Sequence, residues 1–209
     1  MVHLQDHDLT VATYQAITAF SRIGIDIETS GLNKEQDRIA TVQIAYGDNV
    51  VIVRNLQQPI RLLSVLSNAR IQKIFHYGIF DLSFLMRDYQ VIPMNIADTK
   101  ITAQLVDPKK EKFIHPITGK GSLSLIALVW FYFEVQLDKS IAVSDWFSTL
   151  SQEQINYAAE DVRHLPALLD KLLGELSPFE RQKAEFLSNA IPVKILLDRK
   201  ELHDIYAYA

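Results

Sequence analysis

The sequence has 209 residues, of which 48% are hydrophobic and 22% are charged, and its formal net charge is −4. This length and composition predict one compact domain with a sizeable core and exclude a disordered chain. The acidic balance argues against a protein that coats nucleic acid by charge alone, and the absence of cysteine excludes a disulfide framework and a thiolate metal site.

The first residues, MVHLQDHDLT, lack the basic start and the apolar run of a signal peptide. A chain without cysteine also fits a reducing compartment. We therefore expect a cytoplasmic protein.

Apolar residues that alternate with polar ones predict three strands in the first quarter of the chain. The first strand contains the alternating isoleucines of residues 23–27, and residues 38–46 and 49–56 continue the pattern. Residues 47–49, Gly-Asp-Asn, are typical of a turn between the last two strands. The pattern predicts a three-stranded meander.

Strands and helices alternate in the next part of the chain. Residues 62–66 have helical spacing, residues 72–76 resemble a fourth strand, and residues 79–89 again have helical spacing. Helices dominate from there to residue 173. The order predicts an α/β fold, in which helices cover both faces of a mixed sheet.

The most apolar stretch covers residues 123–135, which is shorter than the roughly 20 residues of a membrane-spanning helix. We therefore expect no membrane span and interpret the stretch as a buried helix. A helix that is apolar all round is more often core than interface. The alternative is a subunit interface, which would use the aromatic residues Trp130, Phe131, Tyr132 and Phe133.

The last long helix before the C-terminal segment has a clear start. Ser151 and Gln154 form the two ends of a capping box, and Gly174 is a natural stop. Pro166 falls inside this helix and is expected to kink or split it. We expect a domain of residues 1–175 and a helical tail of residues 176–209 that is not a separate domain.

Two carboxylates lie one residue apart at the end of the first predicted strand. Because residues two apart share a face of a strand, Asp26 and Glu28 project together and the isoleucines point the other way. Carboxylates this close repel each other and raise each other's pKa unless a cation lies between them. A divalent metal resolves the repulsion, although an isolated pair of this kind is more often two exposed acids beside a turn.

Three further residues join this pair. Asp81 lies at the start of the predicted helix of residues 79–89, and Tyr157 and Asp161 lie four apart on one helix face. Oxygen ligands of this kind suit Mg²⁺ or Mn²⁺ rather than zinc. Taken separately, Asp81 is also an acid favoured by the helix dipole and Tyr157 an ordinary half-buried aromatic, so the ordered set carries the argument.

The ordered set D-x-E-T-x-G-L, H-x-x-x-F-D and Y-x-x-x-D resembles the three exonuclease motifs of the DEDD superfamily, in the tyrosine-bearing branch that includes ribonuclease D. The likeness extends over about residues 20–175 and includes LDKSIAVSDW at residues 137–146. It implies a ribonuclease H-like fold and 3′-to-5′ removal of nucleotides with two divalent cations, Mg²⁺ or Mn²⁺.

The resemblance also implies roles for single residues. Tyr157 would lie beside the attacking water, and because a phenol with a pKa near 10 is a poor base at neutral pH, we expect it to orient that water. The histidine-bearing branch has His five residues before the last Asp, where this chain has Asn156. The implied metal ligands are Asp26, Glu28, Asp81 and Asp161.

The substrate contacts that the resemblance implies are Thr29, Leu32, His76, Tyr77 and Lys139. Leu32 would pack against the terminal base, and Lys139 would contact a phosphate. Many relatives have Asn at the position of Tyr77, so this part of the pattern departs from the family. For His76 a buried histidine at a strand end is an equal alternative.

A lysine-bearing loop covers residues 107–121. Its side chains could follow a phosphate backbone, but a solvated loop is the preferred interpretation. The lysines are Lys109, Lys110, Lys112 and Lys120.

The compact size resembles short stand-alone bacterial members that degrade very short RNA, the nano-RNase type, some of which form rings. Ribonuclease D itself continues into extra helical domains where this chain has residues 176–209. We therefore expect short RNA rather than long structured RNA as substrate, and a homo-oligomer as the form to test.

Three interpretations follow. The leading one is a metal-dependent 3′-to-5′ exoribonuclease that acts on single-stranded or short RNA and releases nucleoside 5′-monophosphates. The second is a 3′-to-5′ DNA exonuclease, which the same five residues would serve and which only contacts to the 2′-hydroxyl separate from the first. The third is a non-catalytic nucleic-acid-binding module, which would be free to lose the acids that this chain keeps.

Overall fold

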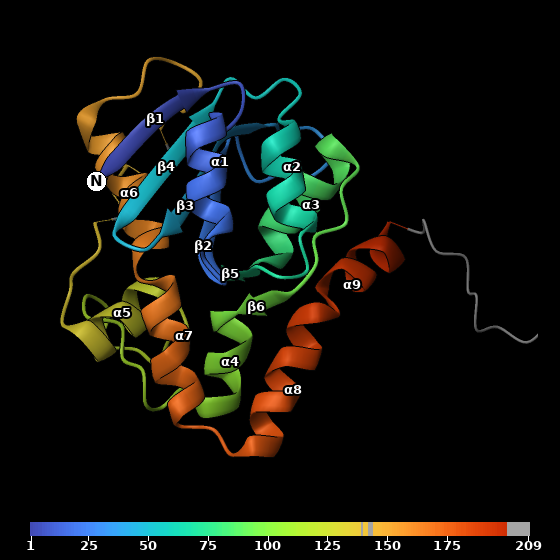
Figure 1. The fold of residues 1–209 in the computed structure, drawn as a ribbon. Helices are drawn as coiled ribbons and strands as arrows, with labels where there is room; N and C mark the ends of the chain where they lie inside the picture. The colour runs from blue at the N-terminus through green and yellow to red at the C-terminus, as the bar shows by residue number, and fades with distance from the viewer. Residues whose placement is uncertain (139, 142–143, 200–209) are drawn as a thin grey trace, which may run out of the picture.

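A mixed sheet of six strands forms the centre of the structure (Figure 1). The structure is a computed structural model and describes residues 1–138, 140–141 and 144–199. The strand order is β1-β4-β3-β2-β5-β6, and β3 is antiparallel to both of its neighbours while the other pairs are parallel. The strands are β1 (Val2–Asp6), β2 (Arg22–Thr29), β3 (Ile39–Tyr46), β4 (Asn49–Arg54), β5 (Gln72–Phe75) and β6 (Ile96–Asp98).

The predicted meander is confirmed in β2, β3 and β4, which pair in sequence as an antiparallel unit. Gly47 lies in the turn between β3 and β4 with φ +52°, a conformation that costs a glycine little. The carboxyl ends of the parallel strands β2, β5 and β6 point toward the same end of the sheet, where β3 begins. This end gathers the residues that the motifs single out.

Two edge strands were not predicted. β1 has only Val2 and Leu4 as apolar residues, and it pairs in parallel with β4, about 50 residues away along the chain. β6 has three residues and pairs in parallel with β5. Both strands depend on pairing with a distant partner, so short-range alternation gives little signal for them.

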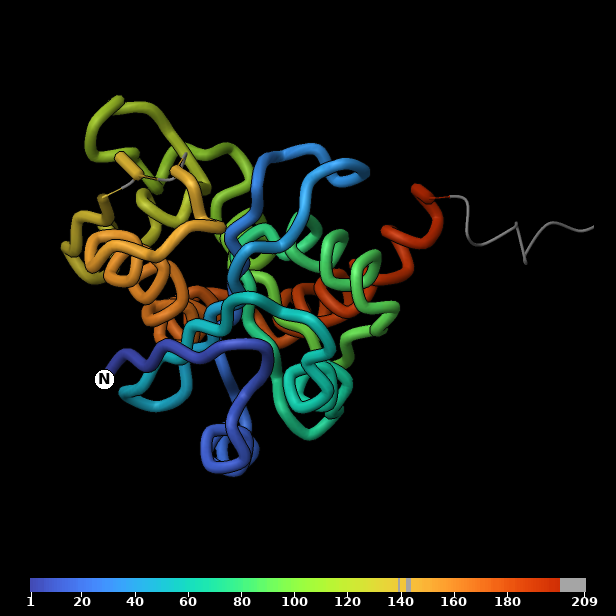
Figure 2. Tube along the Cα trace, turned by 90° about the horizontal axis from the view of Figure 1, so that it is seen from above, coloured from blue at the N-terminus to red at the C-terminus, as the bar shows by residue number. Residues whose placement is uncertain are grey.

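Helices cover both faces of the sheet, as predicted (Figure 2). Each face carries its own buried cluster of side chains. One cluster joins the sheet to α1, α2, α3 and α9, and the other joins it to α4, α5, α6 and α7. The helices are α1 (Val11–Thr18), α2 (Ile60–Ser67), α3 (Ile79–Tyr89), α4 (Thr99–Val106), α5 (Leu125–Phe133), α6 (Gln152–Arg163), α7 (Leu165–Gly174), α8 (Pro178–Asn189) and α9 (Ile191–Asp198).

The predicted break in the last long helix is confirmed. Ser151 caps α6, with both hydrogen bonds of the capping box to Gln154 present, and the chain divides into α6 and α7 at His164, just before Pro166. This junction packs on β2 at Gly24. A Cβ atom at Gly24 would lie 2.5 Å from the carbonyl oxygen of Val162, so only glycine permits this close approach.

The expectation that α5 is wholly buried is wrong for two of its aromatic residues. Leu125, Ala127, Leu128 and Val129 are buried, but Trp130 is 39% and Phe131 is 43% exposed. The helix ends at Glu134, which has φ +56°, and its last turn leaves Trp130 and Phe131 partly exposed. Among the described residues, no helix has the length and apolar character that crossing a bilayer requires.

The described part of the segment after α7 forms the helices α8 and α9. α8 packs on β6 and α4, and α9 packs on α3. Ala184 and Ser188 face inward from α8, and the Ser188 hydroxyl accepts a hydrogen bond from the backbone N–H of Asp98 at 3.1 Å. The described part of the tail therefore covers the β6 edge of the sheet.

Candidate active site

Asp26 and Glu28 lie at the carboxyl end of β2, on the face that α6 covers. Asp26 is in register with Gln43 and Glu28 with Thr41, so the two acids stand beside two buried polar side chains of β3. A register shift between Glu28 and Thr29 ends the regular pairing at this point. The end of β2 therefore presents two carboxylates toward the helix above it.

Asp161 comes to the same place from α6. One ligand oxygen from each of Asp26, Glu28 and Asp161 lies within 4.8 Å of the others, and Asp161 is only 6% exposed. Three carboxylates this close repel one another, and a divalent cation between them removes that cost. Their all-oxygen donor set fits Mg²⁺ or Mn²⁺.

Tyr157 lies one helical turn before Asp161. Burial raises the pKa of its hydroxyl well above the ordinary value, and the negative charges of Asp161, Glu28 and Asp26 raise it further. The raised pKa keeps the hydroxyl protonated in the neutral range, so it is available as a hydrogen-bond donor. Its ring packs on Trp146, with the two ring centroids 5.7 Å apart.

Asp81 lies next to this group but is not one of the three that lie within 4.8 Å. β5 pairs with β2 only as far as Gly24, so the N–H of Ile27 needs another partner. The Asp81 carboxylate accepts that hydrogen bond at 3.1 Å from the first turn of α3. Burial raises the pKa of Asp81, and the charge of Asp26 raises it further.

The stretch before α6 holds the start of that helix. The Gln154 side-chain amide donates hydrogen bonds to the Ser144 hydroxyl and to the Asp145 carbonyl, both at 3.0 Å. Trp146 is buried against Tyr157. The Ser-Asp-Trp sequence therefore positions α6, which carries Tyr157 and Asp161.

The predicted substrate contacts have different surroundings. The Thr29 hydroxyl donates to the Gly31 carbonyl at 2.6 Å and so shapes the turn after β2. Leu32 follows in that turn and is 82% exposed. Lys139 lies outside the described residues.

His76 and Tyr77 follow β5. The His76 Nδ1 atom and the Thr99 hydroxyl form a hydrogen bond at 2.9 Å, and the same hydroxyl donates to the Phe75 carbonyl at 3.1 Å. Tyr77 is half exposed, and the Lys100 ammonium lies 3.9 Å from its ring centroid. Tyr77 and Lys100 line a cavity of about 560 Å³ between α4 and the two tail helices.

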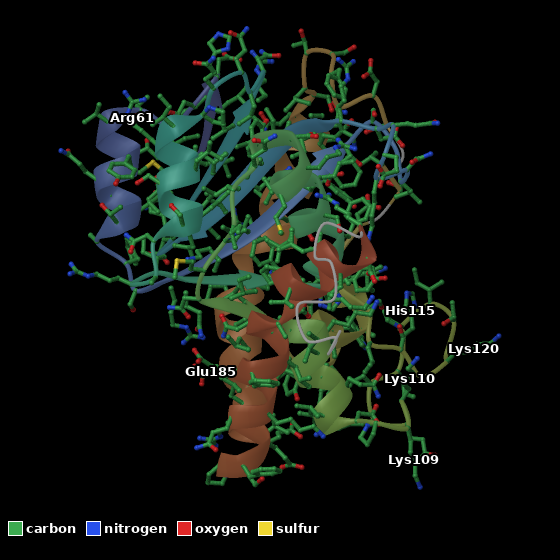
Figure 3. All side chains as sticks on the ribbon, turned by 90° about the vertical axis from the view of Figure 1, so that its right-hand side faces the viewer. Arg61, Lys109, Lys110, His115, Lys120 and Glu185 are labelled. Carbon is green, nitrogen blue, oxygen red and sulfur yellow. The ribbon has the colours of Figure 1, made fainter. Side chains whose placement is uncertain are left out.

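The lysine-bearing loop extends away from the body of the protein (Figure 3). Lys109, Lys110 and Lys120 are exposed, in agreement with a solvated loop. Lys112 differs, because its ammonium forms an ion pair with Glu175 and lies over the rings of Phe113 and Phe131.

Residues 98–100 contact the segment after β5, and no sequence motif singled them out. Asp98 caps α4 by accepting hydrogen bonds from the N–H groups of Lys100 and Ile101. An aspartate directly before a helical segment is a recognisable N-cap signal. That signal predicts a helix start but not the contacts that Asp98 and Thr99 make with the segment after β5.

Residues 1–177 of the chain match a protein family described as 3′-5′ exonuclease. The chain is 29% identical over 161 residues to ribonuclease D of Serratia proteamaculans, across 74% of this chain and 39% of that protein. It is 31% identical over 173 residues to DNA polymerase I of Aquifex aeolicus, across 82% of this chain and 27% of that protein. The chain thus spans well under half the length of these curated relatives.

The structure is also similar to solved structures of NrnC from Brucella melitensis. One, with bound Mg²⁺, has a TM-score of 0.81 and 28% identity and matches 100% of both chains. Another, bound to pGG, has a TM-score of 0.80 and 30% identity and matches 100% of this chain and 99% of that one. The fold likeness confirms the predicted ribonuclease H-like architecture.

Proposed function

Because this chain belongs to the 3′-5′ exonuclease family, as its motifs predicted, we propose that it removes nucleotides from the 3′ end of single-stranded or short RNA. The products of this hydrolysis are nucleoside 5′-monophosphates. The absence of cysteine fits action in the cytoplasm.

The observation that carries the proposal is the convergence of Asp26, Glu28 and Asp161, whose ligand oxygens lie within 4.8 Å of one another. These three carboxylates and Asp81 would hold two divalent cations, Mg²⁺ or Mn²⁺. The cations would supply positive charge to the attacking and leaving oxygens of the phosphodiester displacement. The similarity to NrnC with bound Mg²⁺ supports this assignment.

Asp81 and Tyr157 take different parts in this proposal. Asp81 is buried and its pKa is raised, so nearby positive charge favours its ionised form. Tyr157 keeps its proton because burial and three carboxylates raise its pKa, and its hydroxyl orients the attacking water. The proton of that water leaves to solvent or to a carboxylate rather than to Tyr157.

The remaining contacts would position the 3′-terminal nucleotides. Leu32 is exposed, lies four residues after Glu28 in the chain and would offer an apolar surface to the terminal base. The turn that Thr29 shapes carries Leu32, and His76 and Tyr77, which directly follow β5, would approach the substrate from the end of that strand. Lys139 is proposed as a phosphate contact from its motif position.

Short RNA is the proposed substrate because the chain is similar over its whole length to NrnC, a protein solved in a complex with pGG. A 3′-to-5′ DNA exonuclease is the second candidate. The observation that favours it is the 31% identity to DNA polymerase I of Aquifex aeolicus. A non-catalytic module is disfavoured, because the chain keeps all four acids and Tyr157.

The proposal includes a homo-oligomer. Its support is the exposure of Trp130 and Phe131 on α5 and of Phe179 and Phe186 on α8, the last two being 74% exposed. Contiguous exposed apolar surface is typical of interaction sites. Light scattering coupled to size-exclusion chromatography measures the mass directly, and a monomeric mass would contradict this part.

The decisive experiment incubates the purified protein with Mn²⁺ or Mg²⁺ and 5′-labelled RNA or DNA of matched sequence, from dinucleotides upward. The inactive variant is Asp161→Asn. The matched control is Asp170→Asn, which changes an exposed aspartate on α7 that pairs with Arg22.

A metal-dependent ladder that shortens from the 3′ end of RNA, is lost in Asp161→Asn and is kept in Asp170→Asn is the expected result. Faster loss of the shortest RNAs would support the preference for short substrates. Equal or faster cleavage of DNA would favour the second candidate. Cleavage that survives Asp161→Asn would refute the site.

A further inference from the structure

Asp98, the last residue of β6, joins two segments of backbone through one buried carboxylate. It is 2% exposed. Its Oδ1 atom accepts the N–H groups of Lys100 at 2.8 Å and Ile101 at 3.0 Å, which caps α4. Its Oδ2 atom accepts the N–H of Gly78 at 2.6 Å, in the turn that precedes α3. A helix cap alone needs only the first set of bonds.

The turn that Asp98 holds has an unusual backbone. Tyr77 has φ +65°, in the left-handed region that non-glycine residues rarely adopt. At Gly78 an added Cβ would lie 2.7 Å from the Cβ of Phe75 and 3.4 Å from Oδ2 of Asp98. A turn this tight with a strained residue persists only where surrounding contacts fix it. The short bond from Gly78 to Asp98 is such a contact.

Thr99 adds a second connection to the same segment. Its hydroxyl donates to the Phe75 carbonyl at 3.1 Å and bonds the His76 ring at 2.9 Å. The start of α4 therefore holds residues 75–78 through two consecutive side chains. This arrangement couples the position of the segment after β5 to β6 and α4.

What this turn positions is the first turn of α3. Asp81 follows Gly78 by three residues and accepts the N–H of Ile27 at 3.1 Å. Asp26 is the neighbour of Ile27 in β2 and acts on Asp81 through its charge. A shift of the turn would move Asp81 relative to Asp26.

We propose that Asp98 is a positioning residue for the metal centre, because its carboxylate fixes the turn that sets Asp81 beside Asp26. The inference rests on the proposed function, since it assumes that these acids hold divalent cations. It goes beyond that function by assigning to β6 and α4, which contribute none of the proposed ligands, control over metal affinity.

The chain offers a matched control in Asp107. This aspartate is 5% exposed, and its carboxylate also accepts several backbone N–H groups, from Glu111 at 3.0 Å, Lys112 at 2.9 Å and Phe113 at 3.3 Å. It lies in the loop at the far end of α4, at the opposite end of that helix from Asp98. Asp98→Asn and Asp107→Asn therefore remove similar bonds from the fold.

The experiment measures Mn²⁺ binding by calorimetry, thermal unfolding without metal, and the separate kcat and KM values on a short RNA for both variants. Both substitutions should lower the unfolding midpoint. Only Asp98→Asn should weaken Mn²⁺ binding, by about 10- to 100-fold, the usual effect of removing a residue that orients metal ligands. Its kcat should fall while KM changes little, and Asp107→Asn should match the wild type in binding and kcat.

A second variant keeps the test open if Asp98→Asn does not fold. Gly78→Ala leaves the carboxylate in place but forces the turn apart at Phe75, and it should weaken Mn²⁺ binding in the same direction. Wild-type affinity in a folded Asp98→Asn or Gly78→Ala protein would overturn the inference, as would equal loss in Asp107→Asn. A wild-type protein that binds no Mn²⁺ would overturn the proposed function and this inference together.

Discussion

The two ends of β2 and β5 differ in how their charged side chains are paired. At the amino end, Arg22 pairs with Asp170 at 2.7 Å, and the fully buried Lys73 donates to the Asn68 carbonyl at 2.7 Å. Each of these cations is matched by a separate acceptor. At the carboxyl end, three like charges from Asp26, Glu28 and Asp161 come within 4.8 Å of one another.

The difference separates a structural use of charge from a functional one. A cation beside its own acceptor has its charge partly compensated, whereas gathered carboxylates disfavour the folded chain until positive charge arrives. Natural proteins usually keep a destabilising arrangement of this kind only where function requires it. On this view the carboxyl end gives up stability for activity, and the amino end does not.

The largest effect is expected from Asp161→Asn. Loss of one proposed ligand should reduce metal-dependent turnover by roughly 1,000-fold, since bound cations supply several kcal/mol of charge stabilisation in the transition state. The metal-free variant should unfold at a higher temperature than the metal-free wild type, because one of three repelling charges is gone. Nuclease assays and calorimetric unfolding in EDTA measure the two effects.

Lower stability together with unchanged turnover in Asp161→Asn would contradict this view of the carboxyl end. Asp170→Asn provides the comparison, because it removes one aspartate from the amino end and should leave turnover unchanged.

Tyr157→Phe should have the next largest effect. It removes the hydroxyl that we assign to orienting the attacking water but none of the proposed ligands, so turnover should fall about 100-fold while Mn²⁺ affinity stays the same. Because burial and the neighbouring carboxylates raise the pKa of Tyr157, its ionisation should not appear in the rate between pH 6 and about 9. A rate profile that loses a basic limb on substitution would show that Tyr157 acts as a base.

The residues at the carboxyl end were predictable because each motif lies within a regular element. Alternation in β2 placed Asp26 and Glu28 on one face, and helical spacing placed Tyr157 and Asp161 on one side of α6. The capping box at Ser151 and the break near Pro166 followed from local chemistry, since their bonds join residues a few positions apart. The resemblance then supplied the relation between the separate motifs.

The parts that were missed depend on contacts between distant segments. Asp98 joins β6 to the turn before α3, 20 residues away, and β1 forms only against β4. The exposure of Trp130 depends on how α5 sits against α7, which helical periodicity does not specify. Spacing along the chain gives the type of an element, whereas these features need its partners.

Lys73→Met tests the amino end. Burial lowers the pKa of Lys73 to about 8, so between pH 8 and its ordinary value of 10.5 the unfolded chain binds more protons than the folded one. The free energy of unfolding of the wild type should therefore rise across this window, by roughly 3 kcal/mol in total, and stay level below it. The methionine variant should lack this rise, and chemical unfolding at pH 7 and pH 10 measures the difference.

An unfolding free energy that changes equally with pH in the wild type and Lys73→Met would show that the ammonium is not strained by burial. Turnover at pH 7 should be unchanged in this variant, because Lys73 lies near the amino end of β5, whereas Asp26, Glu28 and Asp161 lie at the carboxyl end of the neighbouring β2.

The smallest effect is expected from the ion pair between Arg22 and Asp170 at the amino end of β2. Asp170 is 62% exposed in its side chain, so water and salt screen its attraction for Arg22, and Asp170→Asn should lower the free energy of unfolding by less than about 1 kcal/mol. Arg22→Ala should have the larger effect, because the arginine side chain also covers the junction near Pro166 and donates to its carbonyl at 3.4 Å. Urea unfolding at low and high salt separates the two contributions, since only the ion pair weakens with salt. If Asp170→Asn proved as damaging as Arg22→Ala, the amino end would depend on its charges as strongly as the carboxyl end does, and the contrast between the two ends would be lost.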